Sequence, residues 1–132
     1  MDNAMQTSLR LRDHIEKYIS EKYGAKPEHL WEKYPEYEVF RHNSEETHKG
    51  KWFLLIANVT YKQIGKMSES EDEDLLVAVV KENPEAIESQ LSKPGFAPAY
   101  HMNKHAWISL MLDGSQPVQV VEEYIDKSYS LT

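Results

Sequence analysis

The side chains best suited to metal binding or catalysis are those of two histidines, His101 and His105. They lie four positions apart in the run HMNKH. On a helix this spacing places two imidazoles on one face, as in a helical zinc site. Zinc requires at least a third protein ligand, and the glutamate of an H-E-x-x-H motif is missing here. The run also leads into a segment with the alternation of a strand. We therefore predict no metal site and no cofactor at these histidines.

Familiar catalytic motifs are missing as well. The chain has no cysteine, which excludes disulfides, thiolate catalysis and cysteine-bound zinc. It has neither the G-x-S-x-G turn of serine hydrolases nor the G-x-x-x-x-G-K-[ST] loop that binds phosphates. With 22 acidic residues and six histidines, some suggestive acid–base pair is expected by chance, and a catalytic pair also needs a shared cleft. We therefore predict a protein that is not an enzyme.

Basic and amide side chains in two segments are better suited to nucleic acid. Lys49, Lys51 and Lys104 could neutralise phosphates. Asn103 and the two histidines beside it could donate hydrogen bonds to phosphates or to base edges. Structural roles remain the alternative: Asn103 and Lys104 could only form a tight turn, and the histidines could only cap strand ends.

The charge balance weakens the nucleic-acid interpretation, since 15 basic against 22 acidic residues give a net charge of -7. The lysines are nevertheless clustered. Residues 47–68 hold four lysines and no acid, residues 89–112 hold two lysines and no acid, and five acids crowd into residues 69–74. The two acid-free segments form one basic patch only if the fold brings them together. Ordinary lysines on solvent-exposed strands are the other interpretation.

Hydrophobic periodicity and turn residues predict the elements. In the first half of the chain we expect a frayed terminus at 1–6, a helix capped by Thr7 or Ser8 and ending at Tyr23, a short helix Pro27–Lys33, and strands Tyr37–His42 and Trp52–Val59. An acidic mobile loop at 61–74 and a strand Leu75–Lys81 follow. In the last third we expect a helix from Asn83-Pro84 to Pro94-Gly95, strands Phe96–His101 and His105–Leu112, and a helix Pro117–Tyr129. The order α(α)-β-β-β-α-β-β-α predicts a single domain over 1–132 of the α+β class, two-layered, with helices on an antiparallel sheet of about five strands.

The last predicted strand has two different faces. Ala106, Ile108, Leu110 and Leu112 alternate with His105, Trp107, Ser109 and Met111, and we expect the first set in the core and the second set outward. An exposed Trp107 could stack on a base, as could Trp52. The same sheet face could instead hold a protein partner or a second copy in a homodimer. Burial under a helix is the structural alternative for both tryptophans.

Two stretches carry a family resemblance. HMNKHAWISLMLDG, followed by a helix ending IDKSY, and FRHNSEETHKGKWFLLIANV upstream resemble the motifs of the MmcQ/YjbR family from about Tyr37 onward. The resemblance implies a fold similar to CyaY and to secretion chaperones, and a double-wing surface that contacts DNA. The residues it implies, with Lys49 added from the charge pattern, are Arg41, His42, Lys49, Lys51, Trp52, His101, Asn103, Lys104, His105 and Trp107.

No apolar run approaches the length of a membrane span, and the N-terminal residues do not resemble a signal peptide. We therefore expect a cytoplasmic protein with no membrane partner. The expected partners are double-stranded DNA, bound weakly and in a salt-sensitive way, or another protein. The salt dependence of the affinity distinguishes a DNA partner from a protein partner. Phosphate binding weakens steeply as the salt concentration rises, whereas an apolar interface hardly responds.

Overall fold

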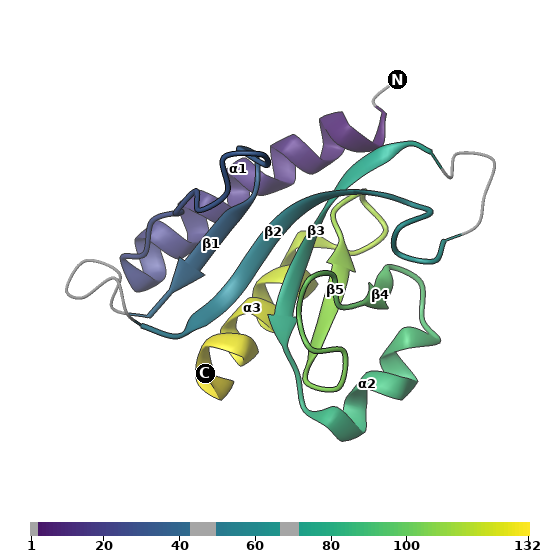
Figure 1. The fold of residues 1–132 in the computed structure, drawn as a ribbon. Helices are drawn as coiled ribbons and strands as arrows, with labels where there is room; N and C mark the ends of the chain where they lie inside the picture. The colour runs from purple at the N-terminus through teal and green to yellow at the C-terminus, as the bar shows by residue number, and fades with distance from the viewer. Residues whose placement is uncertain (1–2, 43–49, 67–71) are drawn as a thin grey trace.

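Strands that are apolar on both faces form the centre of a five-stranded sheet. A computed structural model describes residues 3–42, 50–66 and 72–132. In these segments the order is α1 (Ala4–Tyr23), β1 (Glu38–Arg41), β2 (Trp52–Thr60), β3 (Asp74–Lys81), α2 (Pro84–Leu91), β4 (Phe96–Pro98), β5 (Trp107–Met111) and α3 (Val118–Leu131) (Figure 1). The sheet order is β1-β2-β3-β5-β4, with every neighbouring pair antiparallel. The predicted α+β class and antiparallel sheet are confirmed.

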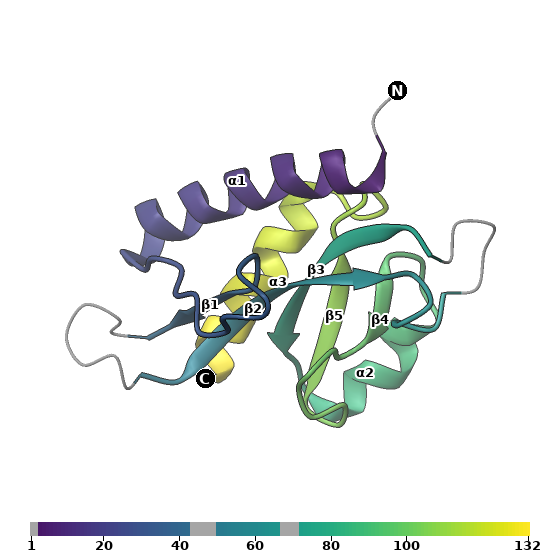
Figure 2. The ribbon, with the colours of Figure 1, turned by 45° about the horizontal axis from the view of Figure 1, so that its top comes forward.

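Each face of the sheet has its own apolar cluster. The three helices lie on one face (Figures 1 and 2), where Phe53, Leu76 and Ile125 are fully buried. On the other face the cluster around Leu55 and Val77 is covered by side chains from residues 25–37 and 99–106, which are not helical. Two layers of regular structure are therefore supplemented by irregular segments that bury the second face.

Helix α1 begins earlier than predicted. Asn3 is its N-cap, and the Asn3 side chain accepts a hydrogen bond from the Gln6 N–H at 2.8 Å while the Gln6 side chain accepts from the Asn3 N–H at 3.0 Å. The expectation of a cap at Thr7 or Ser8, with a frayed end at 1–6, is therefore wrong from residue 3 onward; residues 1–2 lie outside the described segments. Asparagine is as good a cap as serine, and only Asn3 completes the reciprocal pair. The helix ends at Tyr23 as predicted, and Gly24, at φ 67°, is its C-cap.

Replacing Asn3 with alanine should lower the free energy of unfolding by about 1 kcal/mol, because the Gln6 N–H then loses its partner. The matched control is Asn83→Ala. Asn83 is the N-cap residue of α2, but its side chain makes no capping hydrogen bond. Urea unfolding followed by circular dichroism measures both variants. Equal losses in the two would contradict the role given to the Asn3 side chain.

The predicted helix Pro27–Lys33 is wrong. This segment runs along the free edge of β1, where Glu28 and Val39 exchange two backbone hydrogen bonds of 2.9 and 3.0 Å. The Arg41 Nε reinforces the contact by donating to Glu28 Oε2 at 2.6 Å. An edge strand leaves backbone groups unpaired, and pairing them with this segment outweighs a local preference for helix.

The predicted loop at 61–74 contains no helix or strand in its described residues before Asp74, and both of its ends are anchored. Tyr61 begins a turn, its hydroxyl donates to Asp113 at 2.7 Å, and Ile64 is buried. At the other end Glu73 accepts a hydrogen bond from the Ala4 N–H at 3.1 Å, and β3 begins at Asp74. Residues 67–71 lie outside the described segments.

Two buried serines join strands at points where the strands diverge. Ser128 of α3 donates to the Phe53 carbonyl of β2 at 2.6 Å and accepts from the Lys81 N–H of β3 at 2.8 Å. Ser8 of α1 makes the same kind of bridge between Leu112 and Leu76. Each hydroxyl replaces one link of the backbone ladder and fixes a helix on the sheet.

Candidate functional site

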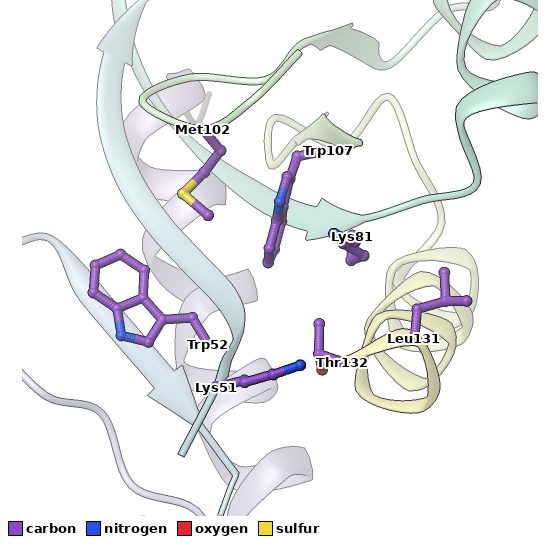
Figure 3. Close-up of a pocket in the computed structure, with 7 residues that line it drawn as sticks. All are labelled: Lys51, Trp52, Lys81, Met102, Trp107, Leu131 and Thr132. Carbon is purple, nitrogen blue, oxygen red and sulfur yellow. The ribbon is translucent and has the colours of Figure 1, made fainter. Parts of the chain in front are cut away.

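The candidate site is a pocket of about 350 Å³ at one end of the sheet (Figure 3). Strand β2 begins here, β3 ends here, β5 begins here, and α3 ends here. A further residue comes from the segment 99–106, which covers this face. The lining residues are Lys51, Trp52, Lys81, Met102, Trp107, Leu131 and Thr132.

Antiparallel pairing explains why these residues meet. The end of one strand lies beside the start of its neighbour, and Lys81 of β3 is the register partner of Trp107 of β5. The β2–β3 ladder stops at Leu54 and Val80, so Trp52 and Lys81 lie just beyond its last pair. The Ser128 bridge holds the strands where they separate, and the pocket forms beside it.

Trp107 is a wall of this pocket, not an exposed side chain. It is only 9% exposed, and Met111 on the same face is only 6% exposed. The expectation that the face carrying Trp107 and Met111 is open to solvent is therefore wrong. The physical reason is the segment 99–106, which places Met102 over this face. The Nζ atom of Lys81 lies 5.5 Å from the centre of the Trp107 ring, a cation–π distance.

The segment 99–106 is a turn, and the predicted strands Phe96–His101 and His105–Leu112 are too long. Asn103 organises the turn: its side chain accepts from the His105 N–H at 2.9 Å, and its carbonyl accepts from the N–H groups of Ala106 and Trp107. The Asn103 side chain thus has the structural role given above as the alternative. Lys104 and His105 are exposed.

His101 differs from its neighbours in backbone and in contacts. It is the one non-glycine residue with positive φ in the described segments, at 61°. Its ring lies 4.1 Å from that of Tyr100 and 6.0 Å from that of Tyr37. The side chain is exposed at the edge of an aromatic group that also includes Trp31, and it does not line the pocket.

The FRH motif has mainly structural contacts. Arg41 is occupied by its ion pair with Glu28. The His42 ring lies 3.9 Å from the Tyr129 ring, and its Nε2 is 2.7 Å from Thr132 Oγ1. Burial lowers the pKa of His42, against a backbone hydrogen bond to Tyr129 that raises it, so a neutral imidazole is favoured. His42 reaches the pocket only through Thr132. Lys49 lies outside the described residues.

The fold brings the two basic segments together only in part. Lys51 and the turn that carries Lys104 lie at the pocket end of the sheet, since Met102 of that turn lines the pocket. Lys62 and Lys66 follow the opposite end of β2, roughly 26 Å away for a strand of this length. Two basic positions are thus separated by the length of the sheet.

Four lining residues were not predicted: Lys81, Met102, Leu131 and Thr132. Met102 stands in the HMNK run and Lys81 closes a predicted strand, so the sequence placed both residues but not their proximity. Leu131 and Thr132 lie beyond the predicted end of the last helix at Tyr129. Strand register and the packing of α3 were needed to find them, and neither is encoded in local periodicity.

Neither a metal-binding cluster nor a membrane-spanning helix occurs in the described segments. These segments contain no group of three His, Asp or Glu side chains placed to hold a metal ion. In the same residues, no helix combines the length and apolar character needed to cross a membrane.

The chain is similar to several known proteins along most of its length. The YjbR family model matches residues 20–131. The uncharacterized protein YyaQ of Bacillus subtilis (strain 168) is 35% identical over 121 residues, which cover 92% of this chain and 97% of that protein. A crystal structure of a Pseudomonas syringae protein matches with a TM-score of 0.82 at 37% identity, covering 92% of this chain and 97% of that one.

A crystal structure of a Deinococcus radiodurans protein matches with a TM-score of 0.68 at 23% identity, covering 91% of this chain and 76% of that one, which shows a shared fold. The antiparallel sheet, the HMNKHAWISLMLDG motif and the family match agree with one another. The chain belongs to the YjbR family.

Proposed function

We propose that this protein binds DNA without catalysing a reaction on it, through phosphate contacts that read little sequence. The supporting observation is that, within the described segments, lysines at the pocket end form no ion pair with a carboxylate. Lys22 and Lys127 are each paired with an acid, at 2.9 and 2.5 Å. In the described residues no such ion pair forms at Lys51, Lys81 or Lys104. Unpaired ammonium groups are free to neutralise phosphates.

The shape of this end of the molecule supports backbone contact over base readout. No helix presents a polar face to a major groove here, because the contributing elements are strand ends and a turn. In this proposal the start of β2 and the segment 99–106 are the two wings. The net charge of -7 opposes binding at long range, so we expect weak affinity that is measurable mainly at low salt.

The double variant Lys51→Ala/Lys104→Ala should lose most of its affinity for duplex DNA, because two phosphate contacts disappear. The slope of log affinity against log salt should shrink by about two. Fluorescence anisotropy of a labelled random duplex, at low and at physiological salt, measures both effects. The matched control is Lys62→Ala/Lys66→Ala, which removes the same charge at the opposite end of the sheet. If the two double variants behave alike, the pocket end is not the DNA surface.

A second candidate is a protein-interaction surface on the segment 25–37. Leu30 and Tyr34 are each 45% exposed, and Trp31 between them makes an edge contact with Trp52 at 5.9 Å. Such apolar exposure favours a protein contact. Self-association that survives high salt and is lost in Leu30→Ser/Tyr34→Ser, measured by sedimentation, would support a homodimer. A monomer at every concentration would exclude it.

A further inference from the structure

We infer that the pocket receives one unpaired base of single-stranded DNA, stacked on Trp52 with its phosphate at Lys51. This inference rests on the proposed function and narrows it from phosphate binding in general to a preference for unpaired strands. Three observations support it: the composition of the pocket, the different burial of its two tryptophans, and the position of its lysines.

The lining combines apolar walls with cations. Trp52, Met102, Trp107 and Leu131 supply the walls, and Lys51 and Lys81 supply positive charge. A ligand that satisfies both must carry a flat apolar group and an anion on the same molecule, as a nucleotide does. The volume of about 350 Å³ lies at the small end of the range for ligand sites, roughly 300–1,000 Å³. The pocket therefore suits one ring system and its substituents.

The two tryptophans have different roles. Trp107 is buried, and the Lys81 ammonium already lies over its ring, so it serves as a fixed wall. Trp52 is only partly buried, and the edge contact with Trp31 holds its indole in place. In Figure 3 Trp52 and Met102 lie on the same side of the pocket, and the Trp107 ring projects into it from β5. Trp52 is thus the surface on which a base can stack.

The cations lie across the pocket from the Trp52 indole, where a phosphate attached to a base on that indole would have to extend. Figure 3 shows the Lys51 side chain extending toward Thr132, on the side opposite the Trp52 indole, with its Nζ beside Thr132. The Thr132 hydroxyl is already engaged, since it lies 2.7 Å from His42 Nε2 and donates to the Ser128 carbonyl at 2.9 Å. Apart from the indole N–H groups and the two ammonium groups, the lining has no free side-chain hydroxyl or amide to read a base edge. The pocket should therefore discriminate little between bases.

Base pairing decides which nucleic-acid strands can place a base in the pocket. A base within a duplex is stacked on both faces, and moving it into a pocket requires unstacking and unpairing. A base in a single strand lacks the pairing penalty and gains the contact with Trp52. The geometry therefore favours single strands over duplexes of equal length and charge.

Three labelled probes test this inference: an oligothymidine strand, the same strand paired with oligoadenine, and a strand of equal length with abasic sugars. In anisotropy at low salt, we expect the single strand to bind about tenfold more tightly than either of the others. Trp52→Ala should remove that difference, whereas Trp52→Phe should keep most of it. Thermal unfolding of each variant confirms that the fold is retained.

The outcomes separate the two proposals. If the abasic strand binds as tightly as oligothymidine, and all binding remains salt-sensitive and lost in Lys51→Ala/Lys104→Ala, the base-binding pocket is overturned while phosphate binding stands. If a mononucleotide quenches tryptophan fluorescence in the wild type and in Trp52→Ala alike, Trp52 is not the stacking surface. If none of the three probes binds at low salt, both proposals fail.

Discussion

Replacing Ser128 with alanine should lower the free energy of unfolding by about 2–4 kcal/mol, a large share of the stability of a domain this size. The Ser128 side chain is fully buried. Its loss leaves the Phe53 carbonyl and the Lys81 N–H without partners where the β2–β3 ladder has already ended. A buried backbone group without a partner costs about 1–3 kcal/mol, and two are affected here.

Urea unfolding followed by far-ultraviolet circular dichroism measures this loss. Ser130→Ala is the matched control, because Ser130 lies on the same helix and is exposed. Alanine favours the helix equally at both positions, so the difference between the variants isolates the buried bridge. Equal stability of the two variants would show that Ser128 is dispensable to the sheet.

The Ser128 bridge also gives the family motif at the end of α3 a structural meaning. Tyr129 follows Ser128, and its ring stacks on Tyr23 of α1 at 3.9 Å and lies beside His42 at the same distance. The Ser-Tyr pair therefore connects α3 to β2, β3 and α1. A motif of this kind preserves the fold, and the pocket depends on it only because α3 ends there.

The second large effect concerns Glu38, a buried carboxyl group on β1. Glu38 is 4% exposed, its Oε2 lies 3.3 Å from His29 Nε2, and its Oε1 is buried with no hydrogen-bond donor. Burial is the main cause that raises the pKa of Glu38 from 4.5 to about 8. A hydrogen bond with Glu16 and charge repulsion from Glu16 raise the pKa of Glu38 further, whereas the positive charge of Arg12 lowers it. The folded protein therefore favours the protonated carboxyl, which can donate to Glu16.

The direction of the pH dependence follows from this raised pKa. The folded state retains a proton that the unfolded chain releases above its ordinary pKa. The associated stability is fully present below about pH 4.5 and is lost progressively as pH rises through about 8. At alkaline pH the folded protein must accommodate a buried negative charge beside Glu16 and Asp13.

Glu38→Gln should therefore be more stable than the wild type above pH 8, by about 2 kcal/mol, and nearly equal to it at pH 5. Glutamine keeps the shape of the carboxylic acid and cannot ionise. Thermal unfolding across this pH range measures the difference. Glu32→Gln, at an exposed position, removes the same charge and should leave the pH profile of the wild type unchanged. Parallel profiles for the wild type and Glu38→Gln would contradict a protonated Glu38.

Local sequence patterns determined the fold class and most elements. Val39 and Phe40 lie on opposite faces of β1, as alternation along a strand requires, and they belong to different apolar clusters. The predicted strands Trp52–Val59 and Leu75–Lys81 are confirmed as β2 and β3, and the predicted end of α1 at Tyr23 is correct. Such features depend on residues that are neighbours in the chain, where steric and hydrophobic preferences are set by short spacings.

The tertiary structure alone decided the candidate site. Trp52, Lys81 and Trp107 belong to three strands, and they meet because of strand register, which alternation does not specify between distant segments. Burial of Trp107 depends on the turn over it, and the segment after Pro27 is not helical because Glu28 pairs with Val39 on the edge of β1. Contacts between distant segments outweighed local preference at these places, since burial and backbone pairing contribute more than single-residue propensities.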